Sequence, residues 1–225
     1  MSQAPLTGAD TAADLALLRR LAAPVSAAYA AYAARALPWF VSPSGTCQVY
    51  RALLGDVNVF SFGPTEDFRE WLVDFLALDV PVKLHPSFGR VHLGFWDDMQ
   101  DALAAITAAL SGLGWPPYYF ASHSKGNEHI LAGAVLTDSG HPPLAMACFE
   151  PPCVAGPDLT AFFQARQVPV LWTKTINATG ADIVTQVPDG PAWQHQGVEI
   201  MLTVPDSDGI AQKHEWPAVL AALAA

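Results

Sequence analysis

The sequence predicts an α/β fold in which a mostly parallel central sheet is flanked by helices. Short apolar runs alternate with helical patterns through the second half of the chain, and this alternation is typical of βαβ units. The chain has 225 residues, of which 52% are hydrophobic and 14% charged. That length and composition suit one globular domain spanning residues 1–225, with a sizeable core.

The first half of the chain predicts a covering helix followed by a hairpin. Residues 11–36 carry apolar positions at helical spacing, and Pro38 comes soon after them. Gly55 and Asp56 separate two apolar runs and form a turn signal of the kind that joins hairpin strands. The remaining predictions are strands over 46–54 and 57–62, a helix over 67–74, an extended segment over 90–93 and a long amphipathic helix over 97–113.

The second half of the chain predicts alternating helices and buried strands. In parallel sheets the reacting groups gather beyond the carboxyl ends of the strands, so the loops after Phe149 and Lys174 are expected at one edge. The predicted elements are a helix over 127–135, strands over 144–149 and 168–174, a helix over 157–167, a strand over 198–204 and a helix over 215–224.

Residues 118–126 carry the strongest motif, an aromatic strand that runs into Ser124 and then into a helix. This pattern is typical of the nucleophile elbow of α/β-hydrolases. Gly126 lets the helix pack closely behind the turn, and Ser122 is small enough to stand where the usual motif has glycine. A serine hydroxyl is a weak nucleophile at neutral pH, so a histidine must take its proton. The alternative is a serine in an ordinary strand-to-helix turn.

An acid and a histidine follow Ser124 in the chain order that this elbow requires. Asp182 lies in the loop just after a buried strand, and Asp206 and Asp208 compete with it for the role of the acid. Two histidines follow Asp182. His214 lies between the last strand and the terminal helix, whereas His195 is interpreted as an exposed loop residue. The alternatives are an ordinary loop aspartate and a surface histidine at a helix start.

An oxyanion hole needs two hydrogen-bond donors. One is the backbone N–H of the residue after the nucleophile, here Lys125. The second is expected from an earlier strand end, where Thr65 offers both its N–H and its hydroxyl. Thr65 as a simple helix N-cap is compatible with this role.

The composition excludes several classes of partner. A net charge of −10 and a pI near 4.9 disfavour nucleic acids and anionic membrane surfaces, because binding to either needs clustered Lys and Arg. The sequence has no apolar stretch of transmembrane length. Cys47, Cys148 and Cys153 show no CxxC spacing, so we expect buried thiols and no zinc site, with a single disulfide bridge left open.

The N-terminal segment has two interpretations. Arg19 and Arg20 precede an alanine-rich run, a weak likeness to a secretion signal. Against that interpretation, Pro24 and Ser26 interrupt the run and an acidic leader precedes it. We therefore expect a packed amphipathic helix and a cytoplasmic protein.

Taken together, these segments resemble the class 3 lipases, the family of the fungal triacylglycerol lipases, over most of the chain. That family shows a strand ending in Phe-Arg-Gly-Thr/Ser, a Trp-containing segment ending in Asp, a His-x-Gly-Phe, a Gly-His-Ser-x-Gly elbow, an Asn-x-x-Asp stretch and a late histidine. The matching segments are Phe62-Gly63-Pro64-Thr65, Glu70-Trp71-Leu72-Val73-Asp74, His92-Leu93-Gly94-Phe95, Ser122-His123-Ser124-Lys125-Gly126, residues 177–188 and His214.

The resemblance implies that Ser124, Asp182 and His214 form a catalytic triad and that Thr65 and Lys125 are the oxyanion donors. It also implies a short lid helix over 65–75 that contacts a lipid interface transiently. A stripe on one face of this segment is apolar, as a lid needs, although packing of the stripe on the core explains it equally well. The stripe consists of Phe68, Trp71, Leu72 and Phe75.

The chain departs from the family pattern around the site. Gly63-Pro64 replaces Arg-Gly, Ser122 replaces the first elbow glycine, and Asn127-Glu128 stands where a glycine and a small residue usually follow. The side chain of Lys125 is interpreted as incidental. These departures concern the pocket and the substrate more than the class of chemistry.

The expected function is a serine carboxylester hydrolase, a lipase or esterase of lipid metabolism that acts on a small-molecule or lipid ester through an acyl-enzyme. No metal or cofactor is implied. The alternatives are another acyl chemistry on the same triad, such as thioester, polyester or acyl-transfer turnover, and a noncatalytic hydrolase-like binding module.

Overall fold

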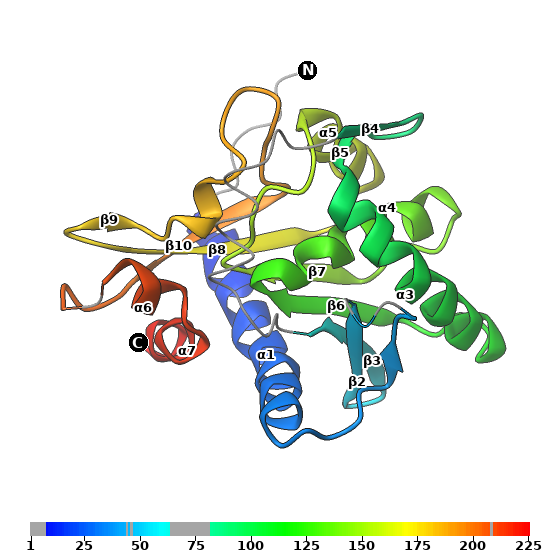
Figure 1. Cartoon of the computed structure of the whole chain (residues 1–225), viewed down its shortest axis with the longest axis horizontal. Coiled ribbons are helices and arrows are strands. Elements are labelled where there is room, and N and C mark those ends of the chain that lie inside the picture. The colour runs from blue at the N-terminus through cyan, green and yellow to red at the C-terminus, as the bar shows by residue number, and fades with distance from the viewer. Residues whose placement is uncertain (1–7, 44, 46, 64–81, 208) are drawn as a thin grey trace.

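The structure, a computed structural model, describes residues 8–225 except 44, 46, 64–81 and 208. Its centre is a sheet with strand order β1-β2-β3-β6-β7-β8-β10, in which β9 pairs with β8 (Figure 1). The strands are β1 Phe40–Val41, β2 Gln48–Leu54, β3 Val57–Phe62, β6 Tyr118–His123, β7 Ala145–Phe149, β8 Val170–Asn177, β9 Gly180–Ala181 and β10 Val198–Thr203.

Most of the sheet is parallel, as the sequence predicts. Strands β3, β6, β7, β8 and β10 run in one direction, and β1, β2 and β9 pair antiparallel to their neighbours. The hairpin prediction is confirmed. Leu54 pairs with Val57 across a turn in which Gly55 has a φ of 64°, a conformation that glycine adopts at little cost.

Helices cover both faces of the sheet (Figure 1). One face packs on α1 Gly8–Ala33 and α7 Trp216–Ala224, and the other packs on α3 Leu93–Gly112, α4 His129–Asp138 and α5 Pro157–Arg166. Strand β6 shows why two cores form. Its side chains alternate, so Phe120 lies in the core beneath α3 and α4 while Ala121 lies in the core beneath α1 and α7.

Three predicted elements differ from those observed. The extended segment at 90–93 is one arm of a separate hairpin, β4 Val82–His85 with β5 Gly89–His92. Helix α3 begins at Leu93, four residues earlier than expected, because the His92 side chain caps it by accepting from Phe95 N. The elbow helix begins as a 3-10 helix, η1 Ser124–Glu128, before α4. The predicted helix over 67–74 lies outside the described residues.

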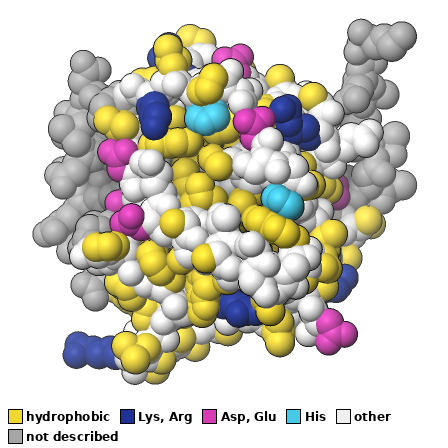
Figure 2. Space-filling model, turned by 90° about the vertical axis from the view of Figure 1, so that its right-hand side faces the viewer, with side chains coloured by type: hydrophobic (Ala, Val, Ile, Leu, Met, Phe, Trp, Pro, Cys, Tyr) yellow, Lys and Arg dark blue, Asp and Glu magenta, His cyan; other side chains and the backbone are white. Residues whose placement is uncertain are grey.

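The surface carries no basic patch on the face that Figure 2 shows. Lys and Arg side chains are spread over this face, and hydrophobic side chains are scattered among the polar ones. No helix in the described part of the chain is long and apolar enough to cross a membrane.

Candidate active site

Ser124 begins η1 directly after β6, in a left-handed conformation with φ 56°. A residue other than glycine rarely adopts this conformation, and the strain costs on the order of 1–3 kcal/mol. The tight turn depends on Gly126. A Cβ atom there would lie 2.7 Å from Phe62 O and 2.8 Å from Ser122 Cβ, so a larger residue would push η1 away from β3. The local geometry is therefore the sharp strand-to-helix turn that the elbow motif predicts.

Ser122, which replaces the first glycine of the elbow motif, has a definite role in this geometry. Its buried hydroxyl accepts a hydrogen bond from Phe62 N at 2.8 Å. The bond joins the end of β6 to the end of β3, from which the chain continues into the segment with the predicted oxyanion donor. That donor, Thr65, and the predicted lid over 65–75 lie outside the described residues.

Asp182 lies immediately after β9 and is fully buried. Its Oδ1 accepts from the backbone N–H of Val184 at 3.1 Å, and its own N–H donates to Thr175 O at 3.0 Å. Its competitor Asp206 is exposed and accepts a hydrogen bond from Ala178 N at 2.9 Å, whereas Asp208 lies outside the described residues. Of the two described candidates, only Asp182 points into the interior.

His214 joins Asp182 to Ser124. It is the last residue of a short helix, α6 Ile210–His214, where a loop was expected, and it is 5% exposed. Its Nδ1 lies 2.6 Å from Asp182 Oδ2, and its Nε2 lies 2.7 Å from Ser124 Oγ. Since the carboxylate accepts the Nδ1 proton, Nε2 is left as the acceptor for the serine hydroxyl. The three predicted residues thus form one hydrogen-bonded chain.

Lys213 anchors the helix that carries His214. Its side chain is fully buried, and its Nζ donates to Asn177 Oδ1 at 3.1 Å, Thr179 Oγ1 at 3.0 Å and Gly180 O at 2.9 Å. These three acceptors lie in the turn between β8 and β9 that leads to Asp182. The lysine therefore connects the histidine helix to the acid loop, a role that sequence reasoning missed.

His123, on β6, packs against the ring of His214 at 4.8 Å between centroids. Its Nδ1 is hydrogen-bonded to the Tyr29 hydroxyl of α1 at 2.5 Å. Burial, with a smaller effect from the nearby His214, lowers the pKa of His123 well below its ordinary value. His123 is therefore neutral at physiological pH and adds no positive charge beside His214.

His195, the other histidine after the acid, was expected to be exposed, and this expectation is wrong. It is partly buried, its ring stacks on Trp172 at 3.9 Å, and its Nε2 donates to Thr185 O at 2.7 Å. Burial lowers the pKa of His195 to about 4. The loop over 185–195 folds back over β8, which places this ring on the sheet instead of in solvent.

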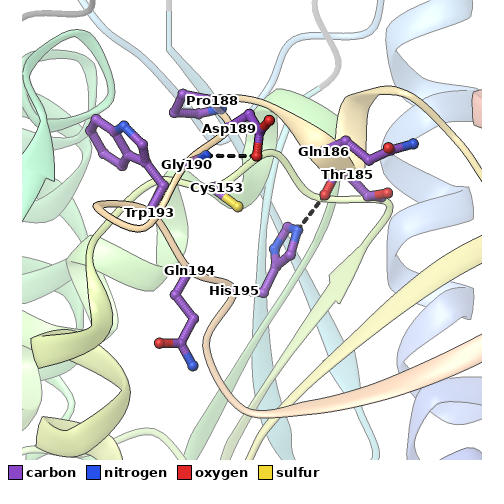
Figure 3. A pocket seen from close by; sticks show the side chains of 9 residues that line it. All are labelled: Cys153, Thr185, Gln186, Pro188, Asp189, Gly190, Trp193, Gln194 and His195. Carbon is purple, nitrogen blue, oxygen red and sulfur yellow. Dashed lines mark hydrogen bonds between the residues drawn. The ribbon is translucent and has the colours of Figure 1, made fainter.

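This loop also lines a polar cavity of about 280 Å³, shown in Figure 3. The residues drawn there include His195, bonded to Thr185, and Cys153. Ser124, Asp182 and His214 do not line this cavity.

All three cysteines are free and buried, which confirms the prediction of thiols. Among the described residues, no group of His, Cys, Asp or Glu is arranged to hold a metal ion.

The side chain of Lys125 is not incidental, contrary to the interpretation from sequence. Its Nζ pairs with Asp98 Oδ2 of α3 at 2.8 Å and lies 3.5 Å from Glu128 Oε2. Glu128 is buried, and burial raises its pKa to about 7 although the charge of Lys125 opposes this effect. The first turn of the elbow helix thus contains a carboxyl group that titrates near neutral pH.

The raised pKa of Glu128 predicts a stability that depends on pH. Below pH 4.5, the ordinary pKa of a glutamate, the proton on Glu128 makes its full contribution to the stability of the folded state. This contribution is lost as the pH rises through about 7, the pKa of Glu128 in the folded protein. Glu128→Gln stays neutral at every pH. We therefore expect its free energy of unfolding, relative to wild type, to rise by on the order of 3 kcal/mol across this window.

Urea unfolding at several pH values between 4 and 9 measures this difference. Glu199→Gln, at an exposed position on β10, is the matched control and is expected to show no such trend. If the difference in free energy of unfolding between Glu128→Gln and wild type stays constant with pH, the raised pKa of Glu128 is contradicted.

Glu150 also belongs to this region and was missed by sequence reasoning. It directly follows the buried strand β7 and lies between Ser124 and His214 in the chain, the same signal that pointed to Asp182. The structure nevertheless pairs His214 with Asp182. Only the contact with the imidazole distinguishes the two acids.

The comparisons with known proteins identify the fold. No protein-family model matches the chain, and no curated protein matches it by sequence. Among solved structures, the Rhizomucor miehei triacylglyceride lipase superposes with a TM-score of 0.65 at 16% identity, covering 88% of this chain and 82% of that one. Lipase II from Rhizopus niveus also gives 0.65, at 17% identity, with 92% and 84% covered.

A mutant form of MDLA from Penicillium cyclopium gives a TM-score of 0.65 at 16% identity, covering 92% of this chain and 86% of that one. Identities this low show a shared fold. The chain therefore has the α/β-hydrolase fold, and the structures that it resembles are those of the fungal class 3 lipases.

Proposed function

We propose that this protein is a serine carboxylester hydrolase that cleaves acyl esters through an acyl-enzyme intermediate. One observation carries the proposal: Ser124, on a strained turn, is linked through His214 to a buried aspartate by hydrogen bonds of 2.7 and 2.6 Å. A nucleophile, a base and a group that orients the base are the parts that nucleophilic catalysis by serine requires.

In the proposed mechanism Ser124 Oγ attacks the ester carbonyl carbon while its proton passes to His214 Nε2. Asp182 stabilises the imidazolium that forms. The tetrahedral intermediate then collapses as His214 gives the proton to the departing alcohol, which leaves an acyl group on Ser124. Water enters, gives a proton to His214 and attacks the acyl-enzyme, and Ser124 recovers its proton as the acid leaves.

The negative oxygen of the intermediate needs donors, and the backbone N–H of Lys125 at the start of η1 is the first that we propose. Because the Lys125 ammonium is engaged by Asp98, only its backbone is assigned to this task. Thr65 is proposed as the second donor by resemblance to the lipase motif. The hydroxyl of Ser122 supports this assignment indirectly, since it holds Phe62, three residues before Thr65.

The proposed substrate is a lipid ester or a small ester with an apolar acyl chain. Two features support this class: the neighbouring structures are named lipases, and the segment over 65–75 carries the apolar stripe expected of a lid that contacts lipid transiently. The low identity leaves chain length to experiment.

The test is labelling by a fluorophosphonate probe, followed by initial rates on p-nitrophenyl esters from acetate to palmitate. We expect the probe to modify Ser124, as read by peptide mass, because only an activated serine reacts. Ester turnover should accompany the labelling, with a long-chain optimum indicating a lipase and a short-chain optimum an esterase.

Two other outcomes are informative. Labelling without turnover on any of these p-nitrophenyl esters would contradict the small or lipid ester substrate and leave thioester, polyester or acyl-transfer chemistry. A protein that is folded but is not labelled at Ser124 would overturn the proposal in favour of a noncatalytic binding module.

A further inference from the structure

The position of His214 depends on a very short helix. Helix α6 is five residues long, and a helix of this length gains little stability from its own hydrogen bonds. Gln212 in this helix is exposed, whereas Lys213 and His214 are buried. Adjacent helical residues point about 100° apart, so the two buried side chains leave the helix in different directions. Each of them therefore makes contacts of its own.

Lys213 reaches from α6 to the tip of the hairpin that β8 and β9 form (Figure 1). The three protons of its ammonium meet three acceptors there: Asn177 Oδ1 at 3.1 Å, Thr179 Oγ1 at 3.0 Å and Gly180 O at 2.9 Å. The Thr179 hydroxyl donates its own proton to Asn177 Oδ1 at 2.8 Å, which leaves its oxygen to accept from the lysine. Each N–H of the ammonium thus has an acceptor at this tip.

The hairpin that Lys213 holds also carries the acid of the proposed triad. Gly180 of β9 pairs with Asn177 of β8, and Asp182 comes directly after β9. The backbone N–H of Asp182 donates to Thr175 O of β8 at 3.0 Å. The acid is therefore fixed to the same two strands whose tip accepts the lysine.

These contacts close a small ring around the pair of His214 and Asp182. Lys213 precedes the histidine by one residue, and its acceptor Gly180 precedes the acid by two. The 2.6 Å bond between His214 Nδ1 and Asp182 Oδ2 completes the ring. A shift of α6 against the hairpin would therefore lengthen the bond on which the tautomer of His214 depends.

Charge pairing does not explain why a lysine is buried at position 213. Among the described residues the acceptors of its ammonium are neutral, and no carboxylate pairs with it. A buried ammonium without a carboxylate partner is costly, and an apolar side chain of similar size would avoid that cost. What the lysine adds is three directed bonds to one turn, and these fix a geometry.

We propose that Lys213 is a positioning residue: its three bonds hold α6 against the β8–β9 hairpin and so keep the imidazole of His214 in place. The imidazole then stays on Asp182 through Nδ1 and on Ser124 through Nε2. This inference rests on the proposed function, since it concerns the base of the same triad. A misplacement of about 1 Å in a catalytic group can cost about 100-fold in rate, so a small movement of α6 should be measurable.

Proton NMR of the full chain tests the positioning without any turnover. The Nδ1 proton of His214, in a short bond to a buried carboxylate, should give a resonance far downfield of the amide protons. Asp182→Asn identifies this resonance by removing the carboxylate. We expect the resonance in wild type and its loss or broadening in Lys213→Met. Lys83→Met is the matched control, because that ammonium lies over the Trp96 ring at 4.2 Å, and it should keep the resonance.

Kinetics tests whether this geometry matters for the rate. Lys213→Met should lower kcat on p-nitrophenyl esters about tenfold or more with KM nearly unchanged, because the lysine acts on the base and not on the binding of the ester. Lys83→Met should keep the wild-type kcat. All rates refer to the folded fraction of each protein, measured by circular dichroism.

A double-mutant cycle separates positioning from a merely structural role. In Asp182→Asn the histidine already has the wrong tautomer, so its exact placement no longer limits the rate. Adding Lys213→Met to that variant should therefore lower kcat by less than about twofold. An equal loss of kcat in both backgrounds would show that Lys213 does not act through the pair of His214 and Asp182.

Three further results would overturn the inference: a wild-type spectrum without the downfield resonance, an unchanged resonance in Lys213→Met, and a wild-type kcat in the folded Lys213→Met. If the methionine variant does not fold, Lys213→Gln decides, because its side chain is polar but too short to reach the three acceptors, and the same losses are expected. If no ester is turned over, the proposed function fails, and the NMR comparison alone decides whether Lys213 holds His214.

Discussion

Replacement of Ser124 by alanine is expected to lower kcat on p-nitrophenyl esters by about 10⁶-fold, with KM close to wild type. The size follows from the loss of the nucleophile, since removal of the serine from a serine hydrolase leaves only the catalysis supplied by the oxyanion hole and by binding. In the described part of the chain the hydroxyl bonds to His214 Nε2 at 2.7 Å and to no other residue, so its removal should leave the fold intact. Steady-state rates on purified protein measure the effect.

The strained turn sharpens this prediction. Alanine, like serine, must adopt the left-handed conformation at position 124, so the strain of the elbow is the same in both proteins. Ser139→Ala is the matched control, because that exposed hydroxyl donates to Val135 O near the end of α4, away from the site. It should keep full activity. A Ser124→Ala protein that keeps more than about one hundredth of the activity would show that the mechanism uses another nucleophile.

Replacement of Asp182 by asparagine is expected to lower kcat by about 10⁴-fold. The carboxylate accepts the Nδ1 proton of His214, whereas an amide that turns its NH₂ toward the ring favours the opposite tautomer, in which Nε2 carries the proton and cannot take one from Ser124. The two side chains are nearly equal in volume, and the amide oxygen can still accept the hydrogen bond that Val184 N donates. The change should therefore act on the rate far more than on stability.

Asp206→Asn is the control for this substitution. That aspartate is exposed and accepts from Ala178 N, a bond that an amide oxygen can also accept. Its kcat should equal that of wild type. Equal losses in Asp182→Asn and Asp206→Asn would contradict the assignment of the acid, and thermal unfolding of both variants shows whether a loss of rate reflects a loss of fold.

Local patterns in the sequence predicted the sharp strand-to-helix turn at Ser124 correctly. Three features within a few residues of one another carried this prediction, so they are visible in the sequence. They are the alternation of apolar residues along β6, the small residue before His123 and the glycine at 126. The hairpin at Gly55 and the buried strands after the elbow were predicted for the same reason. Chain order then limited the acid and the histidine to a few candidates.

Features that depend on distant residues were missed. The hairpin β4–β5 has little hydrophobic pattern of its own, and α6 is only five residues long, which is too short for periodicity to reveal. The exposure of His195 was mispredicted because the ring is covered by Trp172, twenty-three residues earlier in the chain. The ion pair of Lys125 with Asp98 likewise joins two helices that no local pattern connects.

The sequence by itself determined the class of fold, the elbow at Ser124 and the short list of residues that can assist it. Burial periodicity and turn chemistry are local, and they specify which segments become strands, helices and turns. Only the tertiary structure decided that His214 meets Asp182 and that Lys213 ties the helix of His214 to the turn before Asp182. Those contacts depend on how parallel strands end side by side at one edge of the sheet, which is set by register and packing between segments far apart in the chain.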